Sequence, residues 1–355
     1  MTSSHLAVNY LLDDVPLFGG VKVVLRQADL LTRRGHRVTV ISRGSPPDWY
    51  DLEADFLSLP DLAPAACPPA DVTVGTYWTT LEPAVKAAGS GQAAHYCQGF
   101  EALYSHNVAE HSAIRRAYAQ PLPAMVVSEH LAELLRRQFD RPAQSVPQPL
   151  ESTWAPRPEF HPGNPPRILV MSPWEIDWKG VRTALQAVLR LRSEGFPCRL
   201  VRLSQWPLPP EERALLPPDE EWCGVAPSQV PAIVRGCDLL LAPSWEAEGF
   251  GLPVLEAMAS GVPVVASDID CFRGYAGAAA ELVPARDAAA FSAAARNLLA
   301  HPENWRRGRR AGLEVARLYS EERAADGAEA TLEWIASGRW HSEVPSRATP
   351  PKADP

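Results

Sequence analysis

The sequence has little that would indicate a membrane span, a metal site or a nucleic-acid partner. No apolar stretch among its 355 residues reaches the roughly 18 residues that a spanning helix needs. The six cysteines form no Cys-x-x-Cys pair, so they are expected to be free thiols, and no metal-ligand spacing is present. A net charge of −8 argues against a general nucleic-acid binder. The first residues lack a basic region followed by a long apolar run, so a signal peptide is not indicated and we expect a cytoplasmic protein.

The chain has enough length and apolar content for two domains. It is 46% apolar and 21% charged, which allows sizeable cores. A proline-rich stretch lies near the middle, between two strand-like runs, and is the natural boundary. The expected division is an N-terminal domain over 1–155, a linker over 156–166, a C-terminal domain over 167–320, a helix over 321–340 that could cross back to the first domain, and a disordered tail over 341–355.

Strands alternate with helices along both halves, which favours an α/β fold with parallel sheets. Apolar runs predict strands over 5–12, 36–41, 56–59, 71–76, 93–98, 124–127, 145–150, 167–171, 198–204, 221–225, 239–242, 262–266 and 281–283. Helical spacing predicts helices over 21–34, 80–88, 129–139, 181–191, 228–235, 254–259, 288–299, 303–319 and 321–335, with a further helix ending near 118. Ser128 is expected to cap the helix over 129–139.

Two glycines, Gly19 and Gly20, open the first expected helix directly after the first expected strand. Strand, glycine turn, helix and strand form the first unit of a doubly wound sheet. The turn is not Gly-x-Gly-x-x-Gly, which disfavours a nicotinamide site. It could face a ligand or be a tight βα turn without one.

The most informative stretch runs from Asp238 to Asp268. An apolar strand is followed by a loop with Gly249 and Gly251, a short helix that begins near a proline, and a second strand. Glycines let backbone approach a ligand closely, and the start of a helix favours a phosphate. Glu248 and Glu256 frame the turn, so one carboxylate could bind a sugar and the other a ribose, with a diphosphate between them. An ordinary βα turn with solvated carboxylates fits the spacing equally well.

The run EGFGLPVLEAMASGVPVVAS resembles the donor-site signature of the retaining, GT-B-fold glycosyltransferases of family 4, including bacterial surface-polysaccharide and rhamnosyltransferase-like enzymes. The signature is a Glu, seven residues and a second Glu. The resemblance implies two Rossmann-like domains facing across a cleft, an acceptor domain over 1–155 and a nucleotide-sugar donor domain over 167–320. It also implies that Glu248 contacts the donor sugar, Glu256 the ribose, and the backbone of the turn the diphosphate. That turn comprises Gly249, Phe250, Gly251 and Leu252.

Lys179 lies in a second turn, SPWEIDWKG, and resembles the family's lysine that binds the leaving diphosphate. The family's usual arginine five residues earlier is replaced here by Trp174, so a different arginine, or Lys179 with backbone N–H groups, would have to suffice. Many members carry a His at the end of the strand over 93–98, where this chain has Gln98 in the pattern Gln-x-x-Glu ending at Glu101. Some bacterial surface-polysaccharide transferases, including rhamnosyltransferase-like ones, have a similar Gln-x-x-Glu pattern. The departure puts any role of His95 in doubt. Gln98 could bind a sugar hydroxyl or be structural.

The resemblance implies transfer of a hexose or deoxyhexose from a nucleotide-diphosphate sugar to an acceptor hydroxyl, with retention at the anomeric carbon. Lys179, Glu248 and Gln98 are the expected catalytic residues, and Gly19 and Gly20 are expected to contact the donor. No metal and no cofactor are implied beyond the nucleotide sugar itself. Two alternatives stay open: a nucleotide-sugar epimerase of the same fold and a non-catalytic nucleotide-sugar-binding protein.

The expected partners are the nucleotide sugar and an acceptor that the sequence does not identify. A sugar, a lipid-linked sugar and a small natural product are all compatible with it. Exposed arginines on the expected helices of the first half could meet an anionic acceptor or a membrane surface, although solvated helix faces explain them as well.

Overall fold

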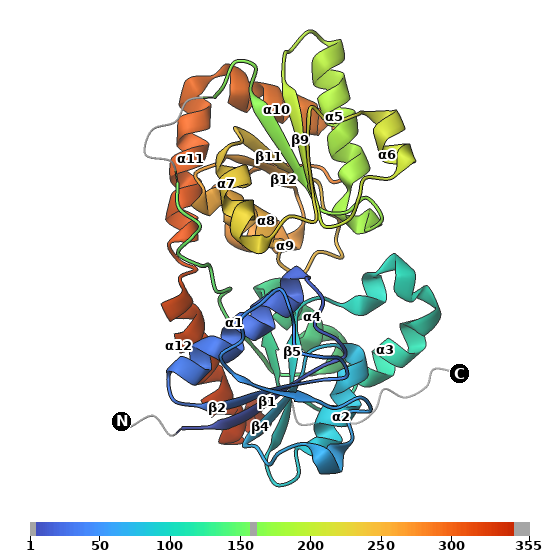
Figure 1. The fold of residues 1–355 in the computed structure, drawn as a ribbon, viewed down its shortest axis with the longest axis vertical. Coiled ribbons are helices and arrows are strands. Elements are labelled where there is room, and N and C mark those ends of the chain that lie inside the picture. Colours follow the sequence, from blue (N-terminus) through green and yellow to red (C-terminus); the bar gives the residue numbers. More distant parts are fainter. Residues whose placement is uncertain (1–4, 157–161, 344–355) are drawn as a thin grey trace, which may run out of the picture. The chain divides into compact units, whose positions relative to one another are not determined.

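The computed structural model describes residues 5–156 and 162–343, and Figure 1 shows their arrangement into helices and strands. The contacts divide these residues into two compact units. The first unit holds residues up to 98, 112–146 and those from 325 onward, and the second holds 99–111 and those from 147 to 324. Residues 157–161 of the expected linker and 344–355 of the expected tail lie outside the described part of the chain.

The first unit contains a seven-stranded parallel sheet in the order β3-β2-β1-β4-β5-β6-β7. Its strands are β1 (Ala7–Leu12), β2 (Arg37–Ser42), β3 (Asp55–Ser58), β4 (Val72–Gly75), β5 (Gln92–Cys97), β6 (Ala124–Val126) and β7 (Ala143–Ser145). The central strands are almost entirely buried, as expected where helices cover both faces of a parallel sheet. The sequence predicted these strands from their apolar runs.

The helices of the first unit include the last long helix of the chain (Figure 1). They are α1 (Gly19–Arg33), α2 (Trp78–Ala87), α3 (His111–Tyr118), α4 (Glu129–Phe139) and α12 (Glu321–Ala336). The Arg34 guanidinium, at the end of α1, lies 2.8 Å from a Glu329 carboxylate oxygen and 2.6 Å from one of Asp326. The ring of His36 lies 3.2 Å from the other Glu329 oxygen. These ion pairs attach α12 to the first unit.

The second unit contains a six-stranded parallel sheet in the order β10-β9-β8-β11-β12-β13. Its strands are β8 (Arg167–Met171), β9 (Arg199–Ser204), β10 (Glu220–Cys223), β11 (Leu239–Ala242), β12 (Val264–Ser267) and β13 (Glu281–Val283). Side chains on both faces of β8 and β11 are buried. Ile168 and Leu241 belong to a core shared with the helices of one face, whereas Leu169 and Leu240 alternate with them.

In the described part of the second unit, five helices lie between these strands and two more, α10 and α11, follow β13 (Figure 1). They are α5 (Val181–Ser193), α6 (Pro210–Leu215), α7 (Val230–Arg235), α8 (Leu252–Ala259), α9 (Asp270–Ala276), α10 (Ala288–Ala300) and α11 (Pro302–Ala316). Trp305 of α11 is completely buried, and its indole N–H donates to the Asp238 carbonyl at 2.7 Å. That hydrogen bond fixes α11 against the turn that enters β11.

Several sequence-based expectations were wrong in detail. The strand expected over 145–150 is β7, which ends at Ser145. Ser128 occupies the N-cap position of α4, but its hydroxyl contacts His130 Nδ1 at 2.9 Å and makes no side-chain cap. The residues after Gly99 form 3-10 turns before α3 begins. The helices α6 and α9 were not predicted.

Within the described residues, no helix is long and apolar enough to cross a membrane. No group of three or more metal-ligating side chains occurs in the same part of the chain.

Candidate functional site

In the second unit, the strand order reverses between β8 and β11. In open α/β sheets, ligands bind outside the carboxyl ends of the strands at such a switch point. Lys179 lies in the loop that follows β8, and the segment from Ser244 to Glu248 lies in the loop that follows β11. The topology therefore brings together the two turns that the sequence singled out.

Lys179 and Glu248 form an ion pair at this switch point, although 69 positions separate them. The ammonium donates to both carboxylate oxygens, at 2.7 and 3.0 Å. The Ser244 hydroxyl donates to one of these oxygens at 2.8 Å. The Glu248 side chain is 8% exposed and that of Lys179 is 21% exposed, so the pair is shielded but reachable.

The environment of Glu248 keeps its carboxylate ionised at neutral pH. Burial by itself would raise the pKa of this group, but the Lys179 charge opposes that effect. Hydrogen bonds from Lys179, the Ser244 hydroxyl and the Gly249 backbone N–H act in the same direction as that charge, and the pKa is lowered overall. Glu248 is thus a fixed acceptor that can receive hydrogen bonds from a ligand's hydroxyl groups.

Glycine is required immediately after Lys179. Gly180 has φ of +66°, and a Cβ placed on it would lie 2.1 Å from the Pro243 carbonyl oxygen. The Trp245 backbone N–H donates to the Trp178 carbonyl at 2.7 Å. Close backbone approach therefore locks the lysine turn against the end of β11.

Residues 99–111 also pack against the lysine turn within the second unit. The Tyr104 ring stacks on Trp178 with a centroid separation of 4.5 Å and an interplanar angle of 6°. The Ser105 hydroxyl donates to Asp177 at 2.9 Å. Glu101, the second residue of the Gln-x-x-Glu pattern, is 3% exposed. These contacts pack Tyr104 and Ser105 against Trp178 and Asp177, the two residues that precede Lys179.

The glycine turn before α8 is held by α9. Gly251 has φ of +78°, and a Cβ placed on it would lie 2.5 Å from the Phe272 ring. The Tyr275 hydroxyl donates to the Gly251 carbonyl at 3.1 Å. Phe250 stacks on Tyr275 with a centroid separation of 4.4 Å. Sequence reasoning missed Tyr275, because nothing in a short helical segment indicates which turn its side chain will reach.

The helix α8 follows the glycine turn and begins at Leu252. Its N-terminus directs backbone N–H groups and the positive end of the helix dipole toward the turn. Glu256 is partly exposed on this helix. Burial raises the pKa of the Tyr275 hydroxyl, and the charge of Glu256 has a smaller effect in the same direction. Gly261 ends the segment with φ of +70°, a conformation that glycine adopts readily after a helix.

A small cavity of about 20 Å³ lies at the switch point, and Lys179, Glu248 and Gly251 line it together with Ser172. This volume is about that of one water molecule. Ser172 has φ of +89°, an uncommon conformation for a residue with a side chain. Ser244 and Ser172 were also missed from the sequence, although a polar residue directly after a buried strand is the signal that could have identified both.

Trp174 occupies the place where an arginine was expected. It packs against the core, and the Arg182 guanidinium lies over its ring at 4.6 Å from the centroid. A cation therefore does lie beside this position, supplied by the first turn of α5.

The structure brings together the expected site residues of the first unit. Gly19 and Gly20 form the start of α1 rather than a turn before it, and a Cβ placed on Gly20 would lie 3.2 Å from Gln98 Oε1, so the helix start and the glutamine are in contact. His95 is completely buried, and neither ring nitrogen has a hydrogen-bond partner. Burial, followed by the charge of Arg141, keeps the pKa of His95 well below its usual range, so this ring is a neutral core group.

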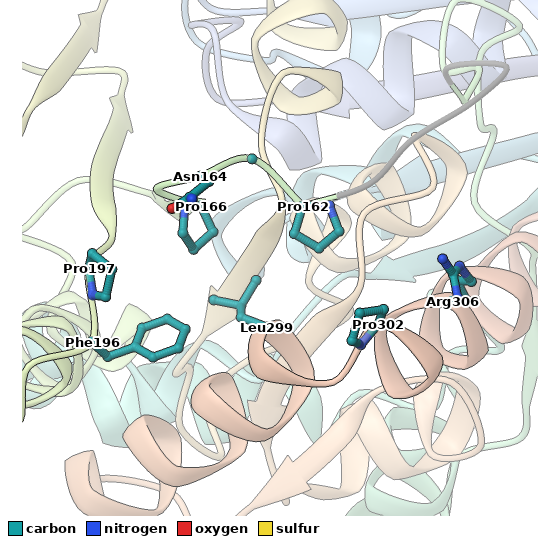
Figure 2. Close-up of a pocket in the computed structure, with 9 residues that line it drawn as sticks. Pro162, Asn164, Pro166, Phe196, Pro197, Leu299, Pro302 and Arg306 are labelled. Atoms are coloured by element: carbon teal, nitrogen blue, oxygen red, sulfur yellow. The ribbon is translucent and has the colours of Figure 1, made fainter.

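A larger cavity of about 330 Å³ lies elsewhere in the second unit (Figure 2). It borders the segments that enter β8 and β9, which places it at the amino ends of those strands. Among the described residues that line it there is no carboxylate, and Arg306 is the one charged group: Pro162, Gly163, Asn164, Pro166, Phe196, Pro197, Leu299, Pro302 and Arg306. Lys179 and Glu248 lie at the opposite edge of the sheet, in the loops that follow β8 and β11.

The chain resembles known glycosyltransferases in part of its sequence and in its fold. Residues 165–301 match the family model described as "Glycosyl transferases group 1". A phosphatidyl-myo-inositol mannosyltransferase from Mycobacterium leprae is 43% identical over 90 residues, which are 25% of this chain and 24% of that protein. An MMP alpha-(1->4)-mannosyltransferase from Mycolicibacterium hassiacum is 33% identical over 162 residues, which are 42% of this chain and 39% of that protein. The matches thus span less than half the length of these curated relatives.

Among solved structures, Anabaena HepE in complex with UDP-glucose matches with a TM-score of 0.74 at 13% sequence identity. The match covers 93% of this chain and all of that one. At this identity the likeness concerns the fold, which is of the GT-B type.

Proposed function

The chain carries a family 4-like glycosyltransferase domain on a GT-B fold, and from that premise we propose that the whole protein transfers a hexose or deoxyhexose from a nucleotide-diphosphate sugar to an acceptor hydroxyl. The observation that carries this proposal is the Lys179–Glu248 pair at the switch point of the second sheet. A cation and a carboxylate are held there side by side, next to a glycine turn that ends in a helix N-terminus.

Each group has a role in the proposed donor complex. Lys179 and the N–H groups at the start of α8 stabilise the diphosphate. Glu248, which is ionised, accepts hydrogen bonds from the hydroxyls of the donor sugar. Glu256, partly exposed on α8, accepts hydrogen bonds from the ribose. Positive φ at Gly251 lets the backbone come close to the phosphates.

The proposed reaction proceeds with retention of configuration. The bond between the anomeric carbon and the diphosphate oxygen breaks, and a bond from the acceptor oxygen forms on the same face. The acceptor's proton passes to an oxygen of the departing diphosphate. Negative charge develops on that diphosphate in the transition state, so Lys179 acts where charge accumulates. Removal of one such contact typically costs about 3 kcal/mol of transition-state stabilisation.

A nucleotide panel tests the proposal. Thermal shifts are measured with UDP, GDP, ADP and dTDP and with their sugars, on wild type, Lys179→Ala and a control, Lys86→Ala. Lys86 pairs with Glu82 on α2, and both side chains are more than half exposed. A nucleotide at a hundred times its Kd adds about 2.7 kcal/mol to the stability of the folded state. We expect one base to stabilise wild type and Lys86→Ala, and to stabilise Lys179→Ala less.

Turnover separates transfer from the alternatives. Release of nucleoside diphosphate only in the presence of an acceptor supports the transferase, and NMR of the product gives the anomeric configuration. Formation of an epimer without acceptor would indicate an epimerase, and binding without any turnover would indicate a sensor. If well-folded protein is stabilised by none of the nucleotides, the proposal is wrong.

A further inference from the structure

A second buried ion pair lies in the second unit, beside the strand that leads to Lys179. The Arg202 side chain, on β9, has no exposed surface, and that of Glu212, on α6, is 1% exposed. Arg202 Nε donates to Glu212 Oε1 at 2.5 Å. Leu200, on the same face of β9, belongs to the apolar core, so the arginine occupies a place where an apolar residue is expected. Burial of two charges is costly, and apolar side chains of similar volume are often at least as stable. Stability alone therefore does not account for this pair.

The Arg202 guanidinium also binds the end of β8. Val170 of β8 lies opposite Arg202 in the register of the two strands. Arg202 Nη1 donates to the Val170 carbonyl at 2.5 Å, and Nη2 donates to the Ser172 carbonyl at 2.9 Å. A guanidinium is planar and its N–H groups have a fixed geometry, so the carboxylate of Glu212 sets the directions in which the other groups donate. One side chain thus fixes two carbonyls at the end of β8.

Ser172 directly follows β8 and begins the loop that carries Lys179. Its φ of +89° is uncommon for a residue with a side chain. Both of its backbone polar groups are held: the N–H donates to the Leu203 carbonyl at 3.1 Å, and the carbonyl accepts from Arg202. Such conformations persist only where the surroundings fix them. Because Ser172 lines the small cavity together with Lys179 and Glu248, Arg202 is connected to that cavity through a single residue.

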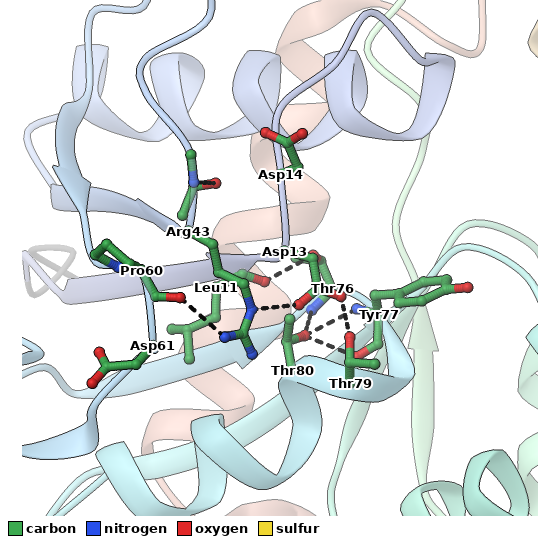
Figure 3. A network of polar contacts seen from close by, with 12 residues as sticks. Leu11, Asp13, Asp14, Arg43, Pro60, Asp61, Thr76, Tyr77, Thr79 and Thr80 are labelled. Atoms are coloured by element: carbon green, nitrogen blue, oxygen red, sulfur yellow. Dashed lines mark hydrogen bonds and ion pairs between the residues drawn. The ribbon is translucent and has the colours of Figure 1, made fainter. Parts of the chain in front are cut away.

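An ion pair in the first unit shows what is particular about Arg202. Asp13 Oδ1 accepts from Arg43 Nε at 3.0 Å and Oδ2 accepts from the Thr79 hydroxyl, while Arg43 also donates to the Pro60 carbonyl at 3.2 Å (Figure 3). The Asp13 side chain is 34% exposed and that of Arg43 is 39% exposed. Exposed pairs of this kind fix geometry weakly, because water competes for the same groups. The pair of Arg202, by contrast, is closed to water.

We propose that Arg202 is a positioning residue for the donor site. It holds the Ser172 peptide at positive φ, and thereby directs the loop that carries Lys179 toward the cavity. The word donor rests on the proposed function, whereas the effect on the loop does not depend on any ligand. Arg202 is too deeply buried to touch a ligand, and Glu212 neutralises its charge, so it contributes geometry rather than electrostatic attraction. A displaced Lys179 would lose its place at the diphosphate, where small misplacements are costly.

Four variants of the full chain separate positioning from stability. The double variant Arg202→Met/Glu212→Leu removes the hydrogen bonds to β8 and leaves no unpaired charge. Glu212→Gln keeps the guanidinium and its bonds to β8 but leaves its charge unpaired. Arg202→Lys keeps the charge but loses the fork of N–H groups. Arg167→Met is the matched control at the other end of β8, where Arg167 donates to the Gly236 carbonyl at 2.7 Å.

Three quantities are measured on each variant. They are Tm, the hydrogen exchange of backbone amides over 172–180 without ligand, and the Kd of the nucleotide that the thermal-shift panel identifies. The N–H groups of Ser172, Lys179 and Gly180 are hydrogen-bonded to backbone carbonyls, so their exchange reports how firmly the loop is held. Exchange over α8 serves as the internal reference in the same unit.

We expect stability and affinity to change independently. The double variant should keep the Tm of wild type, exchange the loop amides faster, and raise the nucleotide Kd about tenfold, which corresponds to about 1.4 kcal/mol. Glu212→Gln should do the reverse, with a Tm lowered by several degrees because a buried charge is unpaired, and with loop exchange and Kd unchanged. Arg202→Lys should raise both loop exchange and Kd less than the double variant, and it provides the test if the double variant does not fold. Arg167→Met should change neither.

The inference is overturned if the double variant exchanges its loop amides and binds nucleotide as wild type does. It is also overturned if Kd rises in step with the loss of Tm across the variants, which is the result that a purely structural role gives. If loop exchange rises in the double variant but no nucleotide binds to wild type, the proposed function is refuted and the hold of Arg202 on the loop stands. If wild type and the double variant bind nucleotide equally well, the proposed function stands and the role of Arg202 does not.

Discussion

Replacement of Lys179 by methionine tests the electrostatics of the switch-point pair directly. The change removes the charge but keeps most of the side chain's volume. Glu248 would then be a buried carboxylate with only the Ser244 hydroxyl and the Gly249 N–H as partners. Removal of one member of a buried ion pair costs about 3–5 kcal/mol. For a unit of this size, 3 kcal/mol lowers Tm by roughly 6–12 °C.

The loss should depend on pH, with a definite sign. In wild type the pKa of Glu248 is lowered, so the carboxylate adds stability above its unfolded pKa of about 4.3, and this is lost as the pH falls through the folded pKa. In Lys179→Met the effect of burial is opposed only by the hydrogen bonds from Ser244 and Gly249, so the folded pKa rises. The variant is therefore destabilised most at neutral pH, and protonation of Glu248 relieves that loss as the pH falls.

Thermal unfolding of both proteins at about pH 7 and about pH 4.5 is the assay, and the Tm difference should be smaller at the lower pH. The double variant Lys179→Met/Glu248→Gln should recover much of the lost stability, because no buried charge remains. Lys86→Met removes a solvent-exposed ion pair and should leave Tm unchanged. An equal Tm difference at both pH values, or a double variant no more stable than the single one, would refute the reasoning.

Two further variants test the backbone of the site. Tyr275→Phe removes the hydrogen bond to the Gly251 carbonyl but keeps the ring, so it should cost about 1 kcal/mol of stability. It should also raise the Kd of the nucleotide found by thermal shift. An unchanged Kd would show that the turn does not depend on Tyr275. Gly180→Ala should destabilise more than Gly195→Ala. Both glycines have positive φ, but only the Cβ at 180 would meet backbone, the Pro243 carbonyl oxygen at 2.1 Å, whereas the Cβ at 195 would meet nothing within 4 Å. Equal losses of Tm in the two alanine variants would show that the clash is relieved at no cost.

Prediction from the sequence was most accurate where the signal is local. Buried parallel strands appear as short apolar runs, and β8 and β11 have the bounds that the sequence predicted. Gly249 and Gly251 lie in the loop between β11 and α8, as the sequence indicated. The short helices α6 and α9 gave no periodic signal, and β7 is only three residues long, so the expected strand was displaced.

The sequence by itself determined the α/β architecture and which turns carry the charged residues. The apolar runs that mark buried strands and the glycines that mark turns are both local features of the sequence. Only the tertiary structure decided that Lys179 and Glu248 form a pair, and that Tyr275 holds the turn at Gly251. The same holds for Asp13 and Thr79, 66 positions apart. These contacts depend on the order of strands in each sheet, and sheet order is set by the packing of the whole unit, so no local pattern records it.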